Sequence, residues 1–336
     1  MSQLRSQVFL RTSSAACLAA ALFLLGGCAA VKVKLGMKVY LSKTPVASIA
    51  ISLPKGPGIA PGEKSPLVVV VTQPDGKVLQ TEGQGKGKVM WKDLTVTASV
   101  ATVNQKGVLT LPRDPRISDG KLVHITVTVP SHPDIHADLD IAVRYNYAFT
   151  SNYDGSPGSS GMSGSDGTNG ASGSTGSTDL NNPSPGGNGG NGTNGSDGQD
   201  GGAGGDAPPV QVRVALKSEG RPLLQVSVSA AGKVKLYLVD PQGGSLTVKA
   251  DGGTGGSGGR GGRGGQGGSG GMGSPSGSSG TSGSDGRSGF DGSPGRGGSI
   301  TVTYDPQVKP FLAAIHLSNI FGPKPVFIEQ PVAPVW

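Results

Sequence analysis

A run of histidine and aspartate residues near residue 135 is the segment whose composition most directly suggests chemistry. His132, Asp134 and His136 alternate with other residues, and Asp138 and Asp140 continue the alternation. In an extended strand, residues two apart share one face and lie about 7 Å from each other. A neighbouring pair could share a metal ion, so His132, Asp134 and His136 are candidate ligands. We favour a simpler interpretation, a solvated strand face opposite a buried one.

Catalytic machinery is not evident elsewhere in the chain. The sequence contains four histidines, two cysteines and no GxSxG nucleophile elbow, because GxSxG occurs only inside a glycine array, at 255–259 and 267–271. Matches to GxGxxG occur only inside glycine-rich stretches, without the strand and helix that a dinucleotide site needs. We therefore expect a protein that is not an enzyme and that needs no cofactor.

Cys28 is the one residue with a clear chemical interpretation. It follows an N-terminal segment with two arginines and an apolar run from Ala15 to Leu25, which is typical of a secretion signal. The residues Leu25-Gly26-Gly27-Cys28 resemble the lipobox of bacterial lipoproteins. The resemblance implies that the signal, residues 1–27, is removed and that Cys28 is acylated, which would anchor the mature chain in membrane lipid.

The lipobox resemblance also implies a location. Cys17 lies within the signal, so the mature chain would hold only the acylated Cys28 and no disulfide. Ala29 follows the cysteine, whereas an aspartate there would mean inner-membrane retention in enteric bacteria. We therefore expect a bacterial cell-envelope protein, in the outer membrane, with a surface or periplasmic face. The charge pattern shows no dense basic cluster, so nucleic acid is not an expected partner.

Residues 28–150 have the pattern of an antiparallel β domain. Short alternating runs such as 94–100 and 124–129 are separated by turn signals, including Gln73-Pro74-Asp75-Gly76. Many short strands of this kind favour a β-sandwich. The stretches around Gly62, Trp91, Gly107 and Val108 resemble bacterial Ig-like domains. That resemblance implies an Ig-like sandwich, with Trp91 in a central strand and a role as spacer or adhesion domain.

Two long glycine arrays occupy residues 151–206 and 251–298. Within them glycine recurs at every third position in four runs, 155–176, 186–204, 252–270 and 277–298. A three-residue period matches an extended left-handed helix with a rise of about 3.1 Å per residue and no internal hydrogen bonds. Glycine edges would allow neighbouring backbones to touch and to pair laterally. We therefore expect two hairpins that turn near 179–185 and 272–276 and form a polyglycine II bundle.

Two alternatives to this bundle remain open. A collagen-like trimer also needs glycine at every third place, but it is usually rich in proline, and the arrays contain only Pro157 and Pro294 within the runs. Disorder is the other alternative, because glycine loses much backbone entropy when it is fixed. The bundle and disorder are both compatible with a monomer, whereas the collagen-like form implies a trimer.

Strand-like segments enter and leave the second array. The phrase Gly-Gly-Ser-Leu-Thr-Val at 243–248 resembles Gly-Gly-Ser-Ile-Thr-Val at 297–302. We expect these two segments to pair as adjacent strands in one small sheet with the strands of 207–250. The arrangement resembles glycine-rich bundles of a phage tail-tip adhesin, a snow-flea antifreeze protein and the anaplastic lymphoma kinase receptor. The likeness implies architecture and no particular activity.

The sequence therefore predicts an all-β protein, with an Ig-like β-sandwich plus a small sheet that carries the glycine bundle. The expected parts are residues 1–27, 28–150, 151–206, 207–250, 251–298 and the closing segment 299–336. The expected function is a non-enzymatic, lipid-anchored structural or adhesive role. One alternative is a surface module that binds an envelope glycan or protein partner through residues such as Arg260 and Arg263. The other is a collagen-like trimeric spacer.

Overall fold

The computed structural model describes residues 32–33, 35–217 and 220–336. Cys28 and the expected signal lie outside these residues. The chain divides into two compact units, which meet in sequence between Tyr145 and Asn146, five residues before the boundary expected from composition. Strand residues far outnumber helical residues in both units, so the prediction of an all-β class is confirmed.

Unit 1 consists of short strands in three sheets, with orders β1-β4-β5, β2-β10-β9-β6 and β3-β8-β7. The pairings are antiparallel except for β2 with β10. The strands are β1 (Ser48–Ser52), β2 (Gly58–Ile59), β3 (Lys64–Pro66), β4 (Val68–Thr72), β5 (Val78–Gln80), β6 (Thr95–Ala98), β7 (Thr102–Val103), β8 (Val108–Thr110), β9 (Leu122–Val129) and β10 (His132–Val143). The helical turns are η1 (Leu41–Lys43), η2 (Gly83–Gly85), η3 (Trp91–Asp93) and α3 (Pro115–Ser118).

The core of unit 1 follows from strand alternation. In β9, Val123, Ile125, Val127 and Val129 are fully buried, whereas the residues between them are more exposed. Val68, Val69 and Val71 of β4 are buried and Val70 is half-buried, and Gly76 closes the predicted turn by donating its N–H to the Gln73 carbonyl. These apolar residues form a single cluster, whose burial supplies the main driving force for folding.

Trp91 does not lie in a strand, and that prediction was wrong. It begins the 3-10 turn η3, and its indole packs directly against Gly107. Gly107 has φ of +70°, and a Cβ atom at this position would run into the indole ring. Residue 107 must therefore be glycine because the Trp91 indole fills the space of a side chain and because φ is positive there. This contact, and not a place in a central strand, accounts for the two residues.

Unit 2 contains two sheets. The first has the order β11-β15-β17 and is entirely parallel, and the second has the order β14-β13-β12-β16-β18. The strands are β11 (Ala148–Asn152), β12 (Val210–Lys217), β13 (Leu223–Ala230), β14 (Lys233–Val239), β15 (Ser245–Lys249), β16 (Ile300–Tyr304), β17 (Ile315–Ser318) and β18 (Val326–Glu329), with the 3-10 helix η4 (Pro306–Ala314) between β16 and β17.

The two sheets of unit 2 pack through apolar and aromatic side chains. Phe149 of β11 lies 5.9 Å from Tyr237 of β14 between ring centroids. The hydroxyl of Tyr153, just after β11, donates a hydrogen bond to the carbonyl of Val228 in β13 at 3.2 Å. Buried residues of β12 and β15, such as Val212 and Leu246, complete the interior.

The prediction that the two Gly-Gly-Ser phrases pair with each other was wrong. β15 pairs with β11 and β17, and β16 pairs with β12 and β18. The shared phrase reflects a shared role, because each strand is a parallel member of its own sheet and connects to one glycine segment.

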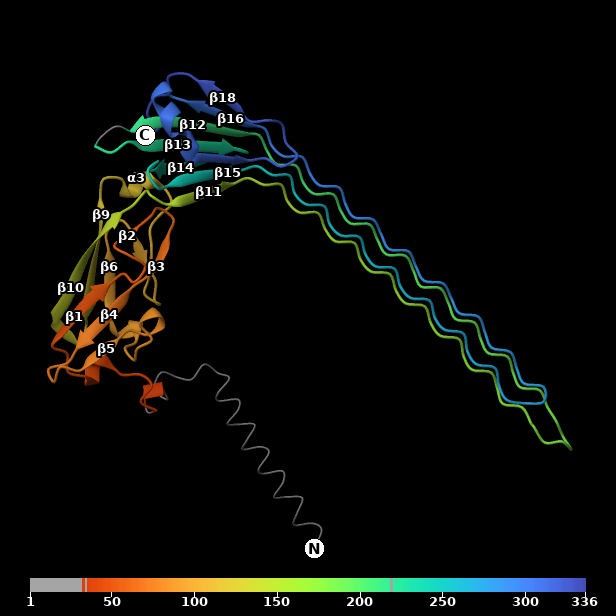
Figure 1. The fold of residues 1–336 in the computed structure, drawn as a ribbon. Coiled ribbons are helices and arrows are strands. Elements are labelled where there is room, and N and C mark those ends of the chain that lie inside the picture. Colours follow the sequence, from red (N-terminus) through yellow and green to blue (C-terminus); the bar gives the residue numbers. More distant parts are fainter. Residues whose placement is uncertain (1–31, 34, 218–219) are drawn as a thin grey trace, which may run out of the picture. The chain divides into compact units, whose positions relative to one another are not determined.

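Four extended segments leave these two sheets and run side by side (Figure 1). They are segment 1 (155–176), segment 2 (186–205), segment 3 (252–271) and segment 4 (277–298), and together we call them the glycine bundle. Segment 1 follows β11, segment 2 leads to β12, segment 3 follows β15 and segment 4 leads to β16. The chain reverses at 180–182 and at 273–275, within the ranges expected for the turns.

Candidate functional site

The glycine bundle is held together by ladders of backbone hydrogen bonds with a three-residue period. In segment 1 every in-phase glycine donates its N–H to a carbonyl of segment 3 or of the residue directly before or after it. Gly155 donates to Asp251, Gly158 to Thr254, and the series continues to Gly176, which donates to Met272, at distances of 2.6–2.8 Å. Every third residue of segment 1 thus forms a lateral backbone hydrogen bond to another segment, although these residues belong to no α-helix or β-strand.

Similar ladders join the other segments and define their places in the bundle. Segment 3 donates to segment 2, segment 2 donates to both segments 1 and 4, and segment 4 donates to segment 3, as in Gly262 to Ser196 and Gly286 to Gly262. Segments 2 and 3 therefore each bond to three neighbours, and segments 1 and 4 each bond to two. The inner place of segment 3 accounts for its repeat of two glycines in every three residues.

Close backbone approach explains why the in-phase residues are glycine. A Cβ atom on Gly262 would collide with the carbonyl of Ser165, and one on Gly261 would collide with the carbonyl of Gly286. The third phase of segment 3 carries Thr254, Arg260 and Arg263, whose side chains are exposed. Two edges of this segment are therefore used for packing, and one edge is available to solvent.

A second ladder uses asparagine and aspartate side chains. One residue in three of segment 2 places its side-chain Oδ1 at 2.7–2.9 Å from a backbone N–H of segment 4, always 90 residues further along the chain. The acceptor residues are Asn188, Asn191, Asn194, Asp197, Asp200 and Asp206. The series is interrupted at Ala203, whose side chain has no oxygen to accept a hydrogen bond. This ladder was not predicted from the sequence, although Asn and Asp recur there at a constant three-residue spacing that indicates it.

The sheets and the bundle share one register. Ala148 pairs with Ser245 in the first sheet, an offset of 97 residues. The same offset separates Asp166 from Arg263 in the bundle, where the backbone N–H of Arg263 donates a hydrogen bond to the Asp166 carboxylate. In the second sheet Val210 pairs with Ile300, an offset of 90, which is also that of the asparagine ladder. The bundle therefore continues the pairing of the sheets.

Asp251 fixes the point at which β15 becomes segment 3. Its Oδ1 accepts a hydrogen bond from the Ser318 hydroxyl at 2.6 Å and from the Ile320 N–H at 2.7 Å, and Lys249 lies 3.4 Å from its other oxygen. Burial acts to raise the pKa of this carboxyl, but the hydrogen bonds and Lys249 outweigh it and hold the pKa below its ordinary value. The carboxylate form thus joins β17 to the base of the bundle.

Charged and apolar residues are unevenly distributed on the bundle. The arginines Arg260, Arg263, Arg287 and Arg296 all lie between the sheets and the middle of the bundle or just beyond its middle. Beyond them, residues 167–195 and 264–284 contain a single charged residue, Asp179. The far end carries Leu180 and Met272, which are 96% and 75% exposed. The bundle therefore presents a charged part next to the sheets, a neutral polar part beyond it, and two exposed apolar side chains at its far end.

The structure separates the candidate metal ligands. His132, Asp134 and His136 lie on β10, but the pairing with β9 is irregular between His132 and His136. His132 contacts the Ser131 hydroxyl, at 3.0 Å. In the part of the chain that the structure describes, no group of three His, Cys, Asp or Glu side chains is placed to hold a metal ion.

A different polar cluster lies on the same sheet face. His124 of β9 has its Nδ1 2.7 Å from Asp140 and its Nε2 3.5 Å from Asp138, while the Thr126 hydroxyl donates to Asp138 at 2.6 Å. The hydrogen bond with Asp140 raises the pKa of His124 above its ordinary value. The sequence analysis missed this cluster because it depends on the cross-strand register. The cluster is exposed, so we interpret it as a surface ion-pair network.

Comparisons with protein-family models and with curated proteins give no relative for this chain. No protein-family model matches it, and no match is found among curated proteins. Within residues 32–33, 35–217 and 220–336, the structure contains no helix that is both apolar enough and long enough to span a bilayer.

Proposed function

We propose that the protein is a non-enzymatic bacterial lipoprotein, anchored through acylated Cys28 in the outer membrane, that displays a rigid glycine bundle in a structural or adhesive role. The observation that carries this proposal is the set of hydrogen-bond ladders within the bundle. Because the ladders are satisfied inside one chain, the bundle is a self-contained extended element. Such an element suits spacing or display.

The finer architecture belongs to the same proposal. We assign the four segments to polyglycine II, an assignment supported by the three-residue period of their lateral hydrogen bonds. We assign unit 1 to the Ig-like class on the strength of its short antiparallel strands around one apolar core. Trp91 packs on Gly107, so two residues of the Ig-like pattern are in contact. Trp91 does not occupy the central strand in which that pattern places it.

A collagen-like trimer is a less economical explanation of the arrays. In a triple helix the N–H of each glycine, which is every third residue, donates to a neighbouring chain. In this chain the corresponding N–H groups, such as those of Gly158 and Gly256, already donate to other segments of the same chain. In a trimeric spacer these bonds within one chain would have to be replaced by bonds between chains. We therefore expect the protein to be a monomer.

Binding of an envelope glycan or protein partner is the second candidate function. It is favoured by Arg260 and Arg263, whose exposed side chains have no carboxylate partner within ion-pair distance among the described residues. Binding to a glycan array that is lost in the double variant Arg260→Gln, Arg263→Gln would support it. Unchanged binding in that variant would assign recognition to other residues.

Labelling with a radioactive or clickable palmitate tests the anchor. We expect label in the wild-type protein and none in Cys28→Ser, with the wild type recovered in outer-membrane fractions. Amide exchange across 252–298 tests the bundle separately, and slow exchange is expected at the glycines that donate in the ladders. An unlabelled wild-type chain would reject the lipoprotein assignment, and fast exchange throughout would reject the rigid bundle.

A further inference from the structure

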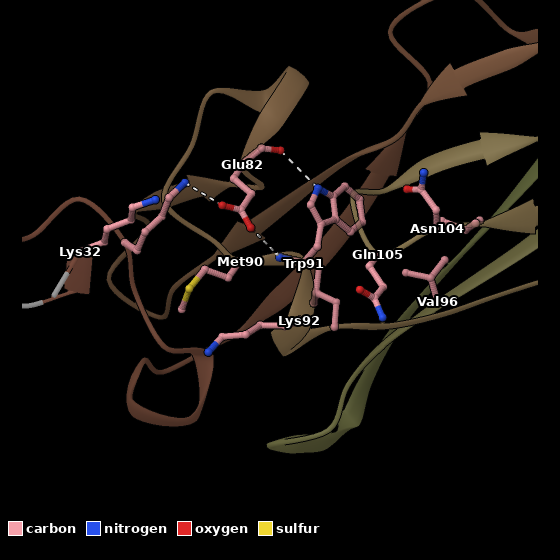
Figure 2. Close-up of a pocket in the computed structure, with 11 residues that line it drawn as sticks. Lys32, Glu82, Met90, Trp91, Lys92, Val96, Asn104 and Gln105 are labelled. Atoms are coloured by element: carbon pink, nitrogen blue, oxygen red, sulfur yellow. Dashed lines mark hydrogen bonds and ion pairs between the residues drawn. The ribbon is translucent and has the colours of Figure 1, made fainter. Parts of the chain in front are cut away.

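Unit 1 contains a hollow beside Trp91 that the proposed function does not use (Figure 2). Its volume is about 620 Å³. The walls come from the chain's first described residues, from the turn η3 and from the strands β6 and β7. The lining residues are Lys32, Lys38, Glu82, Met90, Trp91, Lys92, Leu94, Val96, Val103, Asn104 and Gln105.

The charges around the hollow do not balance. Three lysines line it against one carboxylate, that of Glu82. Lys38 lies 3.0 Å from Glu82, and the Trp91 N–H also donates to this carboxylate at 3.4 Å. Glu82 is thus already compensated, and two positive charges remain.

Lys32 and Lys92 carry those two charges. Neither ammonium has a carboxylate partner among the described residues, and Lys92 has only the ring of Tyr40, 5.0 Å away, as a neighbour for its charge. Figure 2 shows the two lysines flanking Met90. An anion in the hollow would therefore gain two ammonium contacts without displacing an existing ion pair.

The rest of the lining suits a molecule that is only partly polar. Met90 and Leu94 are buried core residues that contribute apolar surface, together with Val96 and Val103. Asn104 and Gln105 supply amide groups at one side. Few precisely placed polar groups over an apolar floor are typical of a site for a small amphiphilic ligand.

The position of the hollow in the chain indicates the source of such a ligand. Lys32 follows Cys28 by four residues, and an extended chain covers at most about 3.5 Å per residue. If Cys28 is acylated, as proposed above, Lys32 is held within roughly 14 Å of the bilayer surface. The anionic groups at that surface are the phosphates of lipids.

We propose that this hollow binds the headgroup of an anionic phospholipid, with Lys32 and Lys92 at the phosphate and the apolar floor against the glycerol and upper acyl carbons. The choice of a lipid rests on the proposed lipoprotein anchor, whereas the affinity for a phosphate-bearing amphiphile rests on the lining alone. Occupancy would hold unit 1 against the lipid surface by a contact additional to the acyl anchor.

Calorimetric titration of the mature chain, residues 28–336 with Cys28→Ser, tests the site without the anchor. The probes are dihexanoyl phosphatidylglycerol, dihexanoyl phosphatidylcholine and inorganic phosphate. We expect the phosphatidylglycerol to bind more tightly than the other two. The double variant Lys32→Gln, Lys92→Gln should weaken it by about fivefold for each lysine removed. The matched control, Lys43→Gln with Lys77→Gln, removes two exposed lysines that do not line the hollow and should leave the affinity unchanged.

Four outcomes would overturn the proposal. Equal binding of the two lipids would remove the role of charge, equally tight binding of inorganic phosphate would remove the lipid, and no binding would remove the site. A loss of affinity in the control variant would show that general positive charge, not the hollow, attracts the lipid. The palmitate experiment on wild-type protein remains independent, so failure of the anchor and failure of this site are distinguishable.

Discussion

Gly262 and Gly190 have different surroundings in the bundle, although both belong to a glycine doublet. A Cβ atom on Gly262 would collide with the Ser165 carbonyl, whereas the nearest atom to a Cβ on Gly190 is the Ala171 nitrogen, at 3.2 Å. In the same phase as Gly190, segment 2 also carries Thr193 and Ser196. The requirement for glycine therefore depends on which edge faces a neighbouring backbone.

Gly262→Ala and Gly190→Ala are the matched pair that tests this distinction. We expect Gly262→Ala to lower the free energy of unfolding of unit 2 by about 3 kcal/mol, because neighbouring backbones must separate. Gly190→Ala should stay within about 1 kcal/mol of wild type, since its neighbour can adjust and the unfolded chain loses entropy. Denaturant unfolding followed by circular dichroism measures both. Equal effects would mean that the edges are not distinguished by packing.

The surface cluster at His124 gives a prediction about pH. Asp140 raises the pKa of His124, so protonation is favoured in the folded state. The stabilisation is fully present below the unfolded pKa of about 6.5 and is lost as the pH rises through the higher folded pKa. Titration by NMR should give a His124 pKa above 6.5 that falls in Asp140→Asn. Asp134→Asn, an equivalent change on the same strand, should leave the titration as it is, and a value of 6.5 in the wild type would contradict the assignment.

At the scale of the elements, the three-residue period was readable from sequence, and the reversals of the chain fall within the expected ranges. Segment 3, which has two glycines in every three residues, bonds to all three of the other segments. The role of Asn188, Asn191 and Asn194 was not recognised, because their partners lie 90 residues away in segment 4. A constant phase of Asn and Asp beside a glycine edge is the signal that identifies such a ladder.

The gap in the ladder at Ala203 gives a prediction at this scale. The segment 4 residue that lies 90 positions after Ala203 is Ser293, and no hydrogen bond is found for the Ser293 N–H among the described residues. Ala203→Asn should add the missing bond and raise the free energy of unfolding by about 0.5–1 kcal/mol. Asn191→Ala should lower it by a similar amount, because Thr281 loses its acceptor. Unfolding curves for the two variants should therefore shift in opposite directions, and two shifts of the same sign would refute the ladder's contribution.

At the scale of the whole chain, composition predicted the all-β class but not the pairing of distant strands. The phrases at 243–248 and 297–302 resemble each other because β15 and β16 have the same role in two different sheets. Sequence similarity cannot distinguish such equivalence from contact, since the offsets of 97 and 90 residues that decide the pairing are long-range. The pocket beside Trp91 was equally hidden, because its walls are distant in sequence.

The shared register predicts how the bundle can be shortened. Removing one three-residue repeat at the same level from all four segments, 168–170, 191–193, 264–266 and 281–283, restores every ladder bond on either side of the deletion. We expect the variant to fold with its stability reduced only by the lost bonds and to be about 9 Å shorter, the rise of three residues in a three-fold extended helix. Electron microscopy or small-angle scattering measures the length.

Deleting Gly264 alone is the matched control. One missing residue moves the remaining part of segment 3 to a different phase. Gln266 would then take the place of Gly265, where a Cβ atom collides with the Thr168 carbonyl of segment 1. Both ends of the segment are fixed, by Asp251 at the sheets and by the turn at 273–275, so the mismatch cannot be relieved by sliding. We expect this smaller deletion to abolish cooperative unfolding of unit 2, while the twelve-residue deletion preserves it. The reverse order of stabilities would show that the glycine segments do not hold a common register with the sheets.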